Sequence, residues 1–178
     1  MHVILETSRL LLREMTAHDT VAIASILQDK ATMYAYEHAF SNQEVKDWID
    51  RQIIRYQQYG FGLWAVVLKK SNEVIGQCGI TMQSIPGKEV PEIGYLLNRK
   101  WWHQGYAIEA AAACRTYAFK QLGFDEVYSI IRDNNIASRN VAVNNGMEIR
   151  GKFIKHYYDM DMPHLIYSVR KNDFIKNA

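Results

Sequence analysis

The sequence predicts a mixed α/β fold, in which about four helices pack against a mixed sheet with one parallel pair of strands near its middle. Two observations support this class. Segments with apolar residues at helical spacing alternate with short runs rich in β-branched and aromatic residues. Two of these runs, residues 92–97 and 127–131, are separated by a long helical segment, and a crossover of that length joins parallel strands.

The individual elements follow from apolar periodicity and from residues that begin or end helices. Ser41 followed by Glu44 is a capping-box pattern, and Gly60 marks the end of the helix that it opens. Gly123 and Gly146 end the two later helices. The expected helices cover residues 18–29, 41–60, 105–122 and 136–145. The expected strands cover residues 9–15, 61–69, 74–82, 92–97, 127–131, 147–154 and 164–170.

The composition is that of an ordinary globular protein, with 48% apolar and 22% charged residues. The formal net charge is +2 and the Lys and Arg residues form no stripe, so no nucleic-acid partner is expected. Apolar runs are too short for a membrane span. Cys78 and Cys114 fit neither a metal nor a redox spacing, so no metal is expected, and such thiols suit a reducing cytoplasm. With no repeat or linker, residues 1–178 are expected to form one domain.

The segment NRKWWHQGYAIEAAAA, residues 98–113, places a single glycine at the start of a helix. The first turn of a helix leaves about four backbone N–H groups without partners, and these groups bind phosphate together with the helix dipole. Gly105 allows a ligand to approach them closely. The lysine-bearing loop of ATP-binding proteins and the GxGxxG turn are both missing. From this turn alone, a phosphate site and a glycine that only relieves a tight turn are equal alternatives.

Three segments in this order resemble the GNAT superfamily of acyl-CoA N-acyltransferases: EIGYLL, the glycine turn, and NNIASRNVAVNNGM at residues 134–147. The phosphate signature of that family is Gln or Arg, two residues, Gly, one residue, then Gly or Ala. Gly105 and Ala107 match its last two positions. Trp102 stands where Gln or Arg is usual, and His103 stands where Gly is frequent.

An aromatic residue at that first position is similar to the branch that contains the ribosomal-protein N-terminal acetyltransferases. The segments at residues 6–19 and 164–174 resemble that branch too, so the likeness covers nearly the whole chain. The resemblance implies a GNAT-like twisted sheet that is mostly antiparallel, with a central parallel pair that splays apart. It also implies a single N-acetyltransferase domain over residues 1–178.

The resemblance implies that acetyl-CoA is the acyl donor. Its pantetheine arm would lie in the gap between strands 92–97 and 127–131, where a backbone N–H would polarise the thioester carbonyl. The residues implied to bind pantetheine through their backbone are Tyr95, Leu96 and Leu97. The residues implied to bind the pyrophosphate are His103, Gln104, Gly105, Tyr106 and Ala107. Asn135 would hold the pantetheine amide, or serve as a helix N-cap, and Asn140 would touch the cofactor.

The chemistry calls for a base, because an aliphatic amine with a pKa of about 10 is mostly protonated at neutral pH. Glu92, at the start of the splayed strand, is the first candidate, and an ordinary surface carboxylate is the alternative. His156 and Glu109 are further candidates for the base, although Glu109 also suits the first turn of a helix.

The leaving thiolate would benefit from a general acid. Many members of the family place a tyrosine seven residues after the Asn of this region, but that position is Ala142. The branch that the chain resembles has Asn-x-x-Ser instead, which Asn135 and Ser138 match. Ser138 is therefore implied to protonate the sulfur.

The acceptor site is implied to lie between the first two helices and the final hairpin. Acidic side chains there would attract a cationic amine, with tyrosines as walls, or they would belong to a solvated loop. These residues are Tyr36, Glu37, Tyr157, Asp159 and Asp161.

The expected function is an acetyl-CoA-dependent N-acetyltransferase that acts on a primary amine, either a protein N-terminus or a small molecule. A non-catalytic acyl-CoA binding or sensing module on the same fold is the alternative. The expected partners are acetyl-CoA and an amine acceptor, without nucleic acid or membrane. A monomer and a homodimer both remain open.

Overall fold

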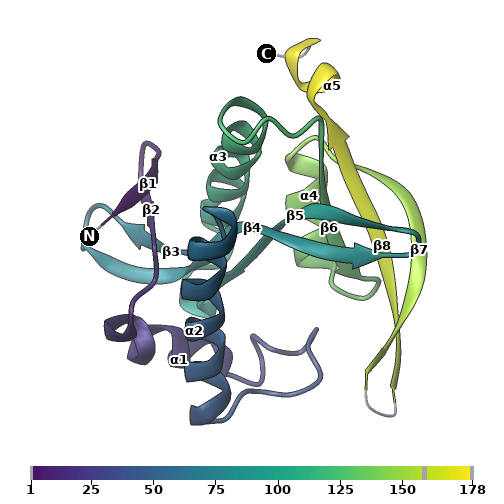
Figure 1. The fold of residues 1–178 in the computed structure, drawn as a ribbon. Coiled ribbons are helices and arrows are strands. Elements are labelled where there is room, and N and C mark those ends of the chain that lie inside the picture. Colours follow the sequence, from purple (N-terminus) through teal and green to yellow (C-terminus); the bar gives the residue numbers. More distant parts are fainter. Residues whose placement is uncertain (1, 158–159, 177–178) are drawn as a thin grey trace.

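A computed structural model describes residues 2–157 and 160–176, and its elements can be followed in Figure 1. The strands form one sheet in the order β1-β2-β3-β4-β5-β6-β8-β7. The strands are β1 (Val3–Glu6), β2 (Leu10–Arg13), β3 (Leu63–Leu68), β4 (Glu73–Ile85), β5 (Lys88–Leu97), β6 (Glu126–Arg132), β7 (Glu148–Tyr157) and β8 (Met160–Arg170). The helices are α1 (Thr20–Leu27), α2 (Asn42–Tyr59), α3 (Tyr106–Lys120), α4 (Ile136–Asn144) and α5 (Lys171–Lys176). Short 3₁₀-helices cover Ala17–Asp19 and Arg99–Trp101.

The pairing of the strands confirms the mixed sheet. β5 and β6 run parallel, and the other neighbouring strands are antiparallel. The crossover between β5 and β6 contains α3, as a parallel connection requires. The parallel pair lies in the interior of the sheet, and α3 and α4 pack against it.

Helices cover both faces of the sheet, and β3 shows this most clearly because all its side chains are buried. Trp64 and Val66 belong to the same core cluster as the buried residues of α3. Leu63 and Ala65 point the other way, into a cluster with residues of α1 and α2. Because successive side chains of a strand alternate between faces, α3 and the α1–α2 pair pack on opposite sides.

Small residues let α3 lie close to the sheet. Ala110, Ala111, Cys114 and Ala118 all have 0% exposure in the larger core cluster. These residues form the face of α3 that packs into the core. The close packing matters for function because it fixes the N-terminus of α3 beside the end of β5.

The structure adds two elements that the sequence pattern did not predict. β1 is a four-residue strand at the edge of the sheet with no fully buried side chain, so it has no alternating pattern to detect. α5 has six residues, too few for a helical period to show. The expected first helix is shorter than predicted, since its start is a separate 3₁₀-helix and α1 begins at Thr20. Within residues 2–157 and 160–176, no helix has the length and apolar character needed to cross a membrane.

Candidate active site

The parallel pair β5–β6 opens into a gap. The two strands share a single ladder position, Glu92 opposite Tyr128. Beyond it, side chains make the connections instead: Ser129 Oγ donates to the Ile93 carbonyl at 2.8 Å, and the Ile130 N–H donates to Glu92 Oε1 at 3.0 Å. The splayed pair expected from the sequence is present.

The alternation of the antiparallel ladder decides which backbone groups face the gap. The Asn98 N–H donates to the Ile75 carbonyl on the β4 side, at 2.9 Å. Residues two apart share the same side, so Leu96 turns its backbone groups toward β4. Tyr95 and Leu97 turn theirs toward the gap, and the Leu97 carbonyl there accepts a bond from Trp102 Nε1 at 2.8 Å. Leu96 contributes its side chain, which lines the space on both sides of the gap.

A cavity of about 240 Å³ lies beside the end of β5 and the N-termini of α3 and α4. Its lining is mostly apolar, with Trp101 and Trp102 on the turn before α3. Of the residues that the sequence implied for cofactor binding, all except Gln104 line it: Tyr95, Leu96, Leu97, His103, Gly105, Tyr106, Ala107, Asn135 and Asn140. The structure thus brings into one place residues that are up to 45 positions apart in the chain.

The turn that precedes α3 contains two residues in the left-handed region. Gly105 is the N-cap with φ of 79°, and His103 has φ of 60°. Glycine adopts this conformation without strain, whereas an L-residue pays for it. A Cβ on Gly105 would meet nothing closer than Arg9 Nη2, at 3.4 Å. The backbone conformation therefore accounts for glycine at this position, and the turn still presents the first N–H groups of α3.

Arg9 brings a positive charge to the same turn. Its Nη1 donates to the Gln104 carbonyl at 3.0 Å, and its guanidinium lies over the Tyr106 ring at 4.3 Å. Its Nε pairs with Glu109 at 2.6 Å. Sequence reasoning missed Arg9, since the contact joins residues 100 positions apart and no local pattern marks it.

Asn135 is the N-cap of α4, so the structural role considered for it is confirmed. Its Oδ1 accepts from the Ser138 N–H at 3.1 Å and from the Tyr34 hydroxyl at 2.7 Å. The Ser138 carbonyl accepts from the Tyr95 hydroxyl at 2.7 Å. The Ser138 side chain borders the cavity, and the structure records no hydrogen bond of its hydroxyl to another described residue.

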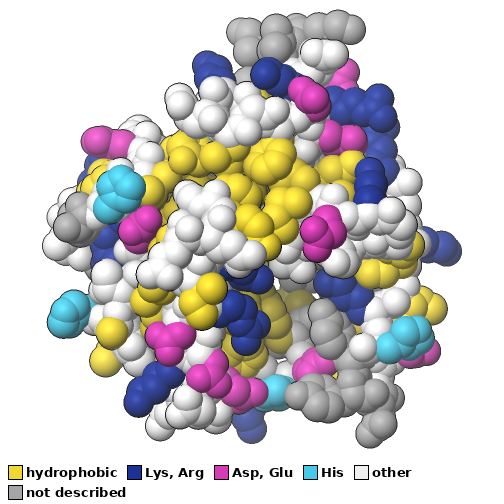
Figure 2. All heavy atoms as spheres, viewed as in Figure 1, with side chains coloured by type: hydrophobic (Ala, Val, Ile, Leu, Met, Phe, Trp, Pro, Cys, Tyr) yellow, Lys and Arg dark blue, Asp and Glu magenta, His cyan; other side chains and the backbone are white. Residues whose placement is uncertain are grey.

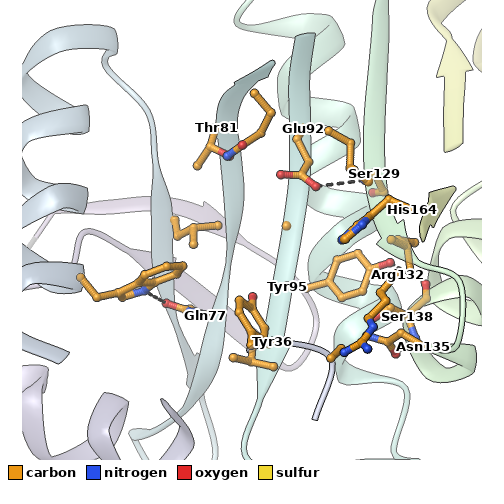
Figure 3. Close-up of a pocket in the computed structure, with 18 of the residues that line it drawn as sticks. Tyr36, Gln77, Thr81, Glu92, Tyr95, Ser129, Arg132, Asn135, Ser138 and His164 are labelled. Atoms are coloured by element: carbon orange, nitrogen blue, oxygen red, sulfur yellow. Dashed lines mark hydrogen bonds between the residues drawn. The ribbon is translucent and has the colours of Figure 1, made fainter. Parts of the chain in front are cut away.

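A larger cavity of about 520 Å³ lies on the other side of the gap, between α2, the loop before it, and β4 to β8. Figure 3 shows Glu92, Tyr95, Ser138 and His164 around this space. Five residues line both cavities: Thr32, Tyr95, Leu96, Asn135 and Ser138. The two cavities therefore meet at the open end of β5–β6.

Glu92 points into the larger cavity (Figure 3). Burial raises the pKa of its carboxyl above the ordinary value, and the hydrogen bond from Ile130 offsets this only in part. A carboxylate whose pKa is raised toward neutrality is a better proton acceptor than an ordinary one. Glu92 is therefore not an ordinary surface carboxylate.

His164 lines the same cavity and was not identified from the sequence. It is 7% exposed, and its Nδ1 lies 2.8 Å from the Met162 carbonyl. A carbonyl only accepts hydrogen bonds, so Nδ1 carries the proton and Nε2 keeps its lone pair in the neutral ring. Burial lowers the pKa of His164, which favours that neutral form. In the sequence, the signal that could have identified His164 was its place on the inward-facing side of a buried strand.

These features match a known family. The family model described as "Acetyltransferase (GNAT) domain" matches residues 9–148. The chain belongs to the GNAT acetyltransferase family. It is an acyltransferase, and the alternative of a non-catalytic binding module is not supported.

Relatives of this GNAT protein are found among curated sequences and solved structures. "Uncharacterized protein YkkB" of Bacillus subtilis is 35% identical over 144 residues, covering 80% of this chain and 84% of that protein. "Uncharacterized N-acetyltransferase YoaA" of the same organism is 28% identical and covers 94% of this chain and 97% of its own length. A GNAT acetyltransferase structure from Bacillus anthracis has a TM-score of 0.80 at 24% identity, covering 97% and 99% of the two chains. The ribosomal L7/L12 N-terminal acetyltransferase RimL, solved with coenzyme A, has a TM-score of 0.79 at 19% identity, covering 95% and 98%.

Other residues considered as the base in this GNAT protein lie elsewhere. Glu109 lines neither cavity. Burial alone would raise its pKa, but hydrogen bonds from Thr7, Arg9 and Ser8 outweigh it and hold the pKa below the ordinary value. His156 pairs with Asp161 and lines neither cavity. Neither Glu109 nor His156 therefore lies where it could act as the base in either cavity.

The acceptor residues expected from the resemblance are only partly brought together. Tyr36 and Glu37 line the larger cavity, whereas Asp161 does not. Asp159 and the Tyr157 side chain lie outside the described residues. The cavity wall instead carries four basic side chains that the sequence reading did not assign: Arg51, Arg55, Arg132 and Lys155.

Proposed function

We propose that this protein transfers an acetyl group from acetyl-CoA to a primary amine. The observation that carries the proposal is the meeting of the two cavities at the open end of β5–β6. A transfer between two substrates benefits from such an arrangement, because donor and acceptor enter from different sides and are held within reach of one another.

Acetyl-CoA occupies the smaller cavity in this proposal. Its pyrophosphate lies at the turn before α3, where backbone N–H groups and the helix dipole favour an anion. Arg9, which is paired with Glu109, supports this turn by donating to the Gln104 carbonyl. The pantetheine arm follows the gap-facing backbone groups of Tyr95 and Leu97, and one of their N–H groups polarises the thioester carbonyl.

The amine enters from the larger cavity. Glu92 removes a proton from the ammonium group, and the free amine attacks the thioester carbon. The new C–N bond forms, the C–S bond breaks, and the second nitrogen proton passes to solvent. The Ser138 hydroxyl gives a proton to the departing sulfur and regains one from solvent. His164 is the second candidate for the base, since its neutral ring borders the same space.

The test is an acceptor screen with acetyl-CoA. Released thiol and the mass of each amine after incubation are measured together. We expect thiol release that depends on an added amine, with a product heavier by one acetyl group. Thiol release that is the same with and without amines, with no acetylated product, would contradict the proposal.

A further inference from the structure

The larger cavity carries a charge pattern that the proposed reaction does not by itself explain. One face of α2 borders it, with side chains at helical spacing: Glu44, Trp48, Arg51 and Arg55. Figure 2 shows Lys and Arg side chains beside hydrophobic ones around the hollow near the centre of that view. The opposite wall adds Lys155 from β7 and Arg132 from the end of β6.

Two of the three carboxylates that line this cavity already have hydrogen-bond partners within the protein. Glu44 accepts from the Ser41 N–H at 2.7 Å and pairs with His38 at 2.7 Å, so it belongs to the cap of α2. Glu92 has a raised pKa and accepts from the Ile130 N–H. Glu37 is the remaining carboxylate, and its Oε1 is buried without a hydrogen-bond partner among the described residues.

Among the basic side chains of this cavity, Arg55 has the surroundings that most favour binding of an anionic ligand. It is partly buried, and its Nη1 donates to Gln52 Oε1 at 3.2 Å. Among the described residues, no carboxylate lies within ion-pair distance of Arg55 or Arg51. Arg51 lies one helical turn away and repels it. A guanidinium stays charged under such conditions and offers two parallel donors that match a carboxylate.

Arg55 and Lys155 also act on Glu92, whose pKa both of them lower against the effect of burial. A simple ammonium ion brought beside Glu92 would therefore meet two cations in the same cavity. An acceptor that carries its own anionic group would remove that repulsion. The anionic group would accept hydrogen bonds from Arg55, and Glu37 would accept hydrogen bonds from N–H groups of the acceptor.

We propose that the acceptor is a small amine that also carries a carboxylate, as amino acids do, with the carboxylate held by Arg55 beside Lys155 and the amine directed toward Glu92. This inference rests on the proposed acetyl transfer and names the class of its acceptor. A cavity of about 520 Å³ has room for a molecule of that size.

The test compares acceptors in matched pairs that differ only in the carboxylate. Glycine, β-alanine and γ-aminobutyrate, which each carry one carboxylate, are each paired with the corresponding carboxamide, and kcat/KM is measured at fixed acetyl-CoA. The carboxylates are expected to be better by about tenfold to a hundredfold, the size of a charge-assisted hydrogen bond. Equal values within the pairs would overturn the inference and leave the proposed function standing.

Variants test whether Arg55 is the residue that causes the preference for carboxylate acceptors. Arg55→Gln should raise KM at least tenfold more for the carboxylate acceptors than for the carboxamides, while its effect on the pKa of Glu92 is shared by both members of each pair and KM for acetyl-CoA stays nearly unchanged. Lys46→Gln removes a positive charge from an exposed position of the same helix outside the cavity and should change nothing. An equal loss for both members of each pair would overturn the role of Arg55.

A final arm separates this acceptor class from protein N-termini. Short peptides with an acidic or a neutral second residue are tested beside the amino acids. Acetylation of the peptides alone would overturn the inference, although acetyl transfer itself would stand. Absence of any acetylated product across all the amines would overturn the proposed function and this inference with it.

Discussion

At the scale of single residues, burial shifts the pKa values of the two side chains that we propose as candidates for the base. Glu92 has a raised pKa and His164 a lowered one, and both border the larger cavity. Each shift moves the group toward the form or the affinity that suits a base near neutral pH. Burying a carboxylate in this way is costly for folding, so the site exchanges stability for reactivity.

The variant Glu92→Gln tests separately the role of Glu92 as a base and the cost of its burial for folding. If Glu92 is the base, kcat/KM should fall by about 10² to 10⁴ and lose its rise with pH through the raised pKa of Glu92. The deficit should shrink at high pH, where free amine is abundant. A pH–rate profile with a good amine acceptor measures both effects.

The same variant should be more stable than the wild type at neutral pH. Between the ordinary and the raised pKa of Glu92, the folded protein holds a proton that the unfolded chain has released. Stability therefore falls as pH rises through that window and stays lower above it, and Gln has no such penalty. Urea unfolding at several pH values checks this, with Glu89→Gln on an exposed position of β5 as the control. An unchanged pH–rate profile, with activity lost in His164→Gln instead, would move the role of base to His164.

Ser138→Ala tests the proton donor. Its hydroxyl has no hydrogen bond to another described residue. The hydrogen bond from its backbone N–H to Asn135 Oδ1 is kept in the variant. Stability should therefore stay the same, while kcat falls on the order of tenfold with little effect on acetyl-CoA affinity. A donor with a more acidic thiol should reduce the deficit. Full kcat in the variant would remove Ser138 from the mechanism.

At the scale of elements, the conformation of the turn before α3 supports the proposal that the start of this helix binds an anion. His103 and Gly105 both adopt left-handed backbone conformations in this turn. These conformations bring the first N–H groups of α3 to the cavity. His103 stands where the family often has glycine, and its φ of 60° explains why glycine suits the position.

Gly105→Ala should lower the free energy of unfolding by about 1–2 kcal/mol, the cost of a left-handed L-residue. The cause is the backbone, because the new Cβ has room beside Arg9. His103→Ala is the matched control, since it exchanges one L-residue for another at positive φ and should stay within about 0.5 kcal/mol. Urea unfolding measures both, and a fully stable Gly105→Ala would contradict the conformational argument.

At the scale of the whole molecule, the gap between β5 and β6 results from the way in which the strands of the sheet pair. β5 and β6 meet at one ladder position and then part, because β6 follows β8 while β5 stays paired with β4. The cavities on the two sides of the gap draw on elements from every part of the chain between α1 and β8. A ligand that fills the gap therefore ties the two halves of the sheet together.

Acetyl-CoA should accordingly stabilise the whole fold. At about 100 times its dissociation constant it should contribute roughly 2.7 kcal/mol, which for a chain of this size raises Tm by roughly 5–10 °C. ATP and NAD should have much smaller effects, because neither carries a pantetheine arm. A melting curve that neither acetyl-CoA nor coenzyme A shifts would contradict the assignment of the smaller cavity.

Local features of the structure were predictable from local pattern. The capping box of Ser41 and Glu44 and the left-handed Gly60 end α2 as expected, since both depend on residues near in sequence. The four-residue β1 and the six-residue α5 were missed because neither is long enough to show a period.

The sequence by itself determined the mixed sheet, the parallel crossover and the turn before α3, because apolar periodicity, helix caps and glycine positions act over a few residues. Only the tertiary structure decided which charged groups share a cavity. Arg9, His164 and Arg55 were not recognised, and Glu109 and His156 were displaced, because these assignments depend on contacts between distant segments. The proton affinity of Glu92 is likewise set by burial beneath residues of other strands and helices, which only the folded chain supplies.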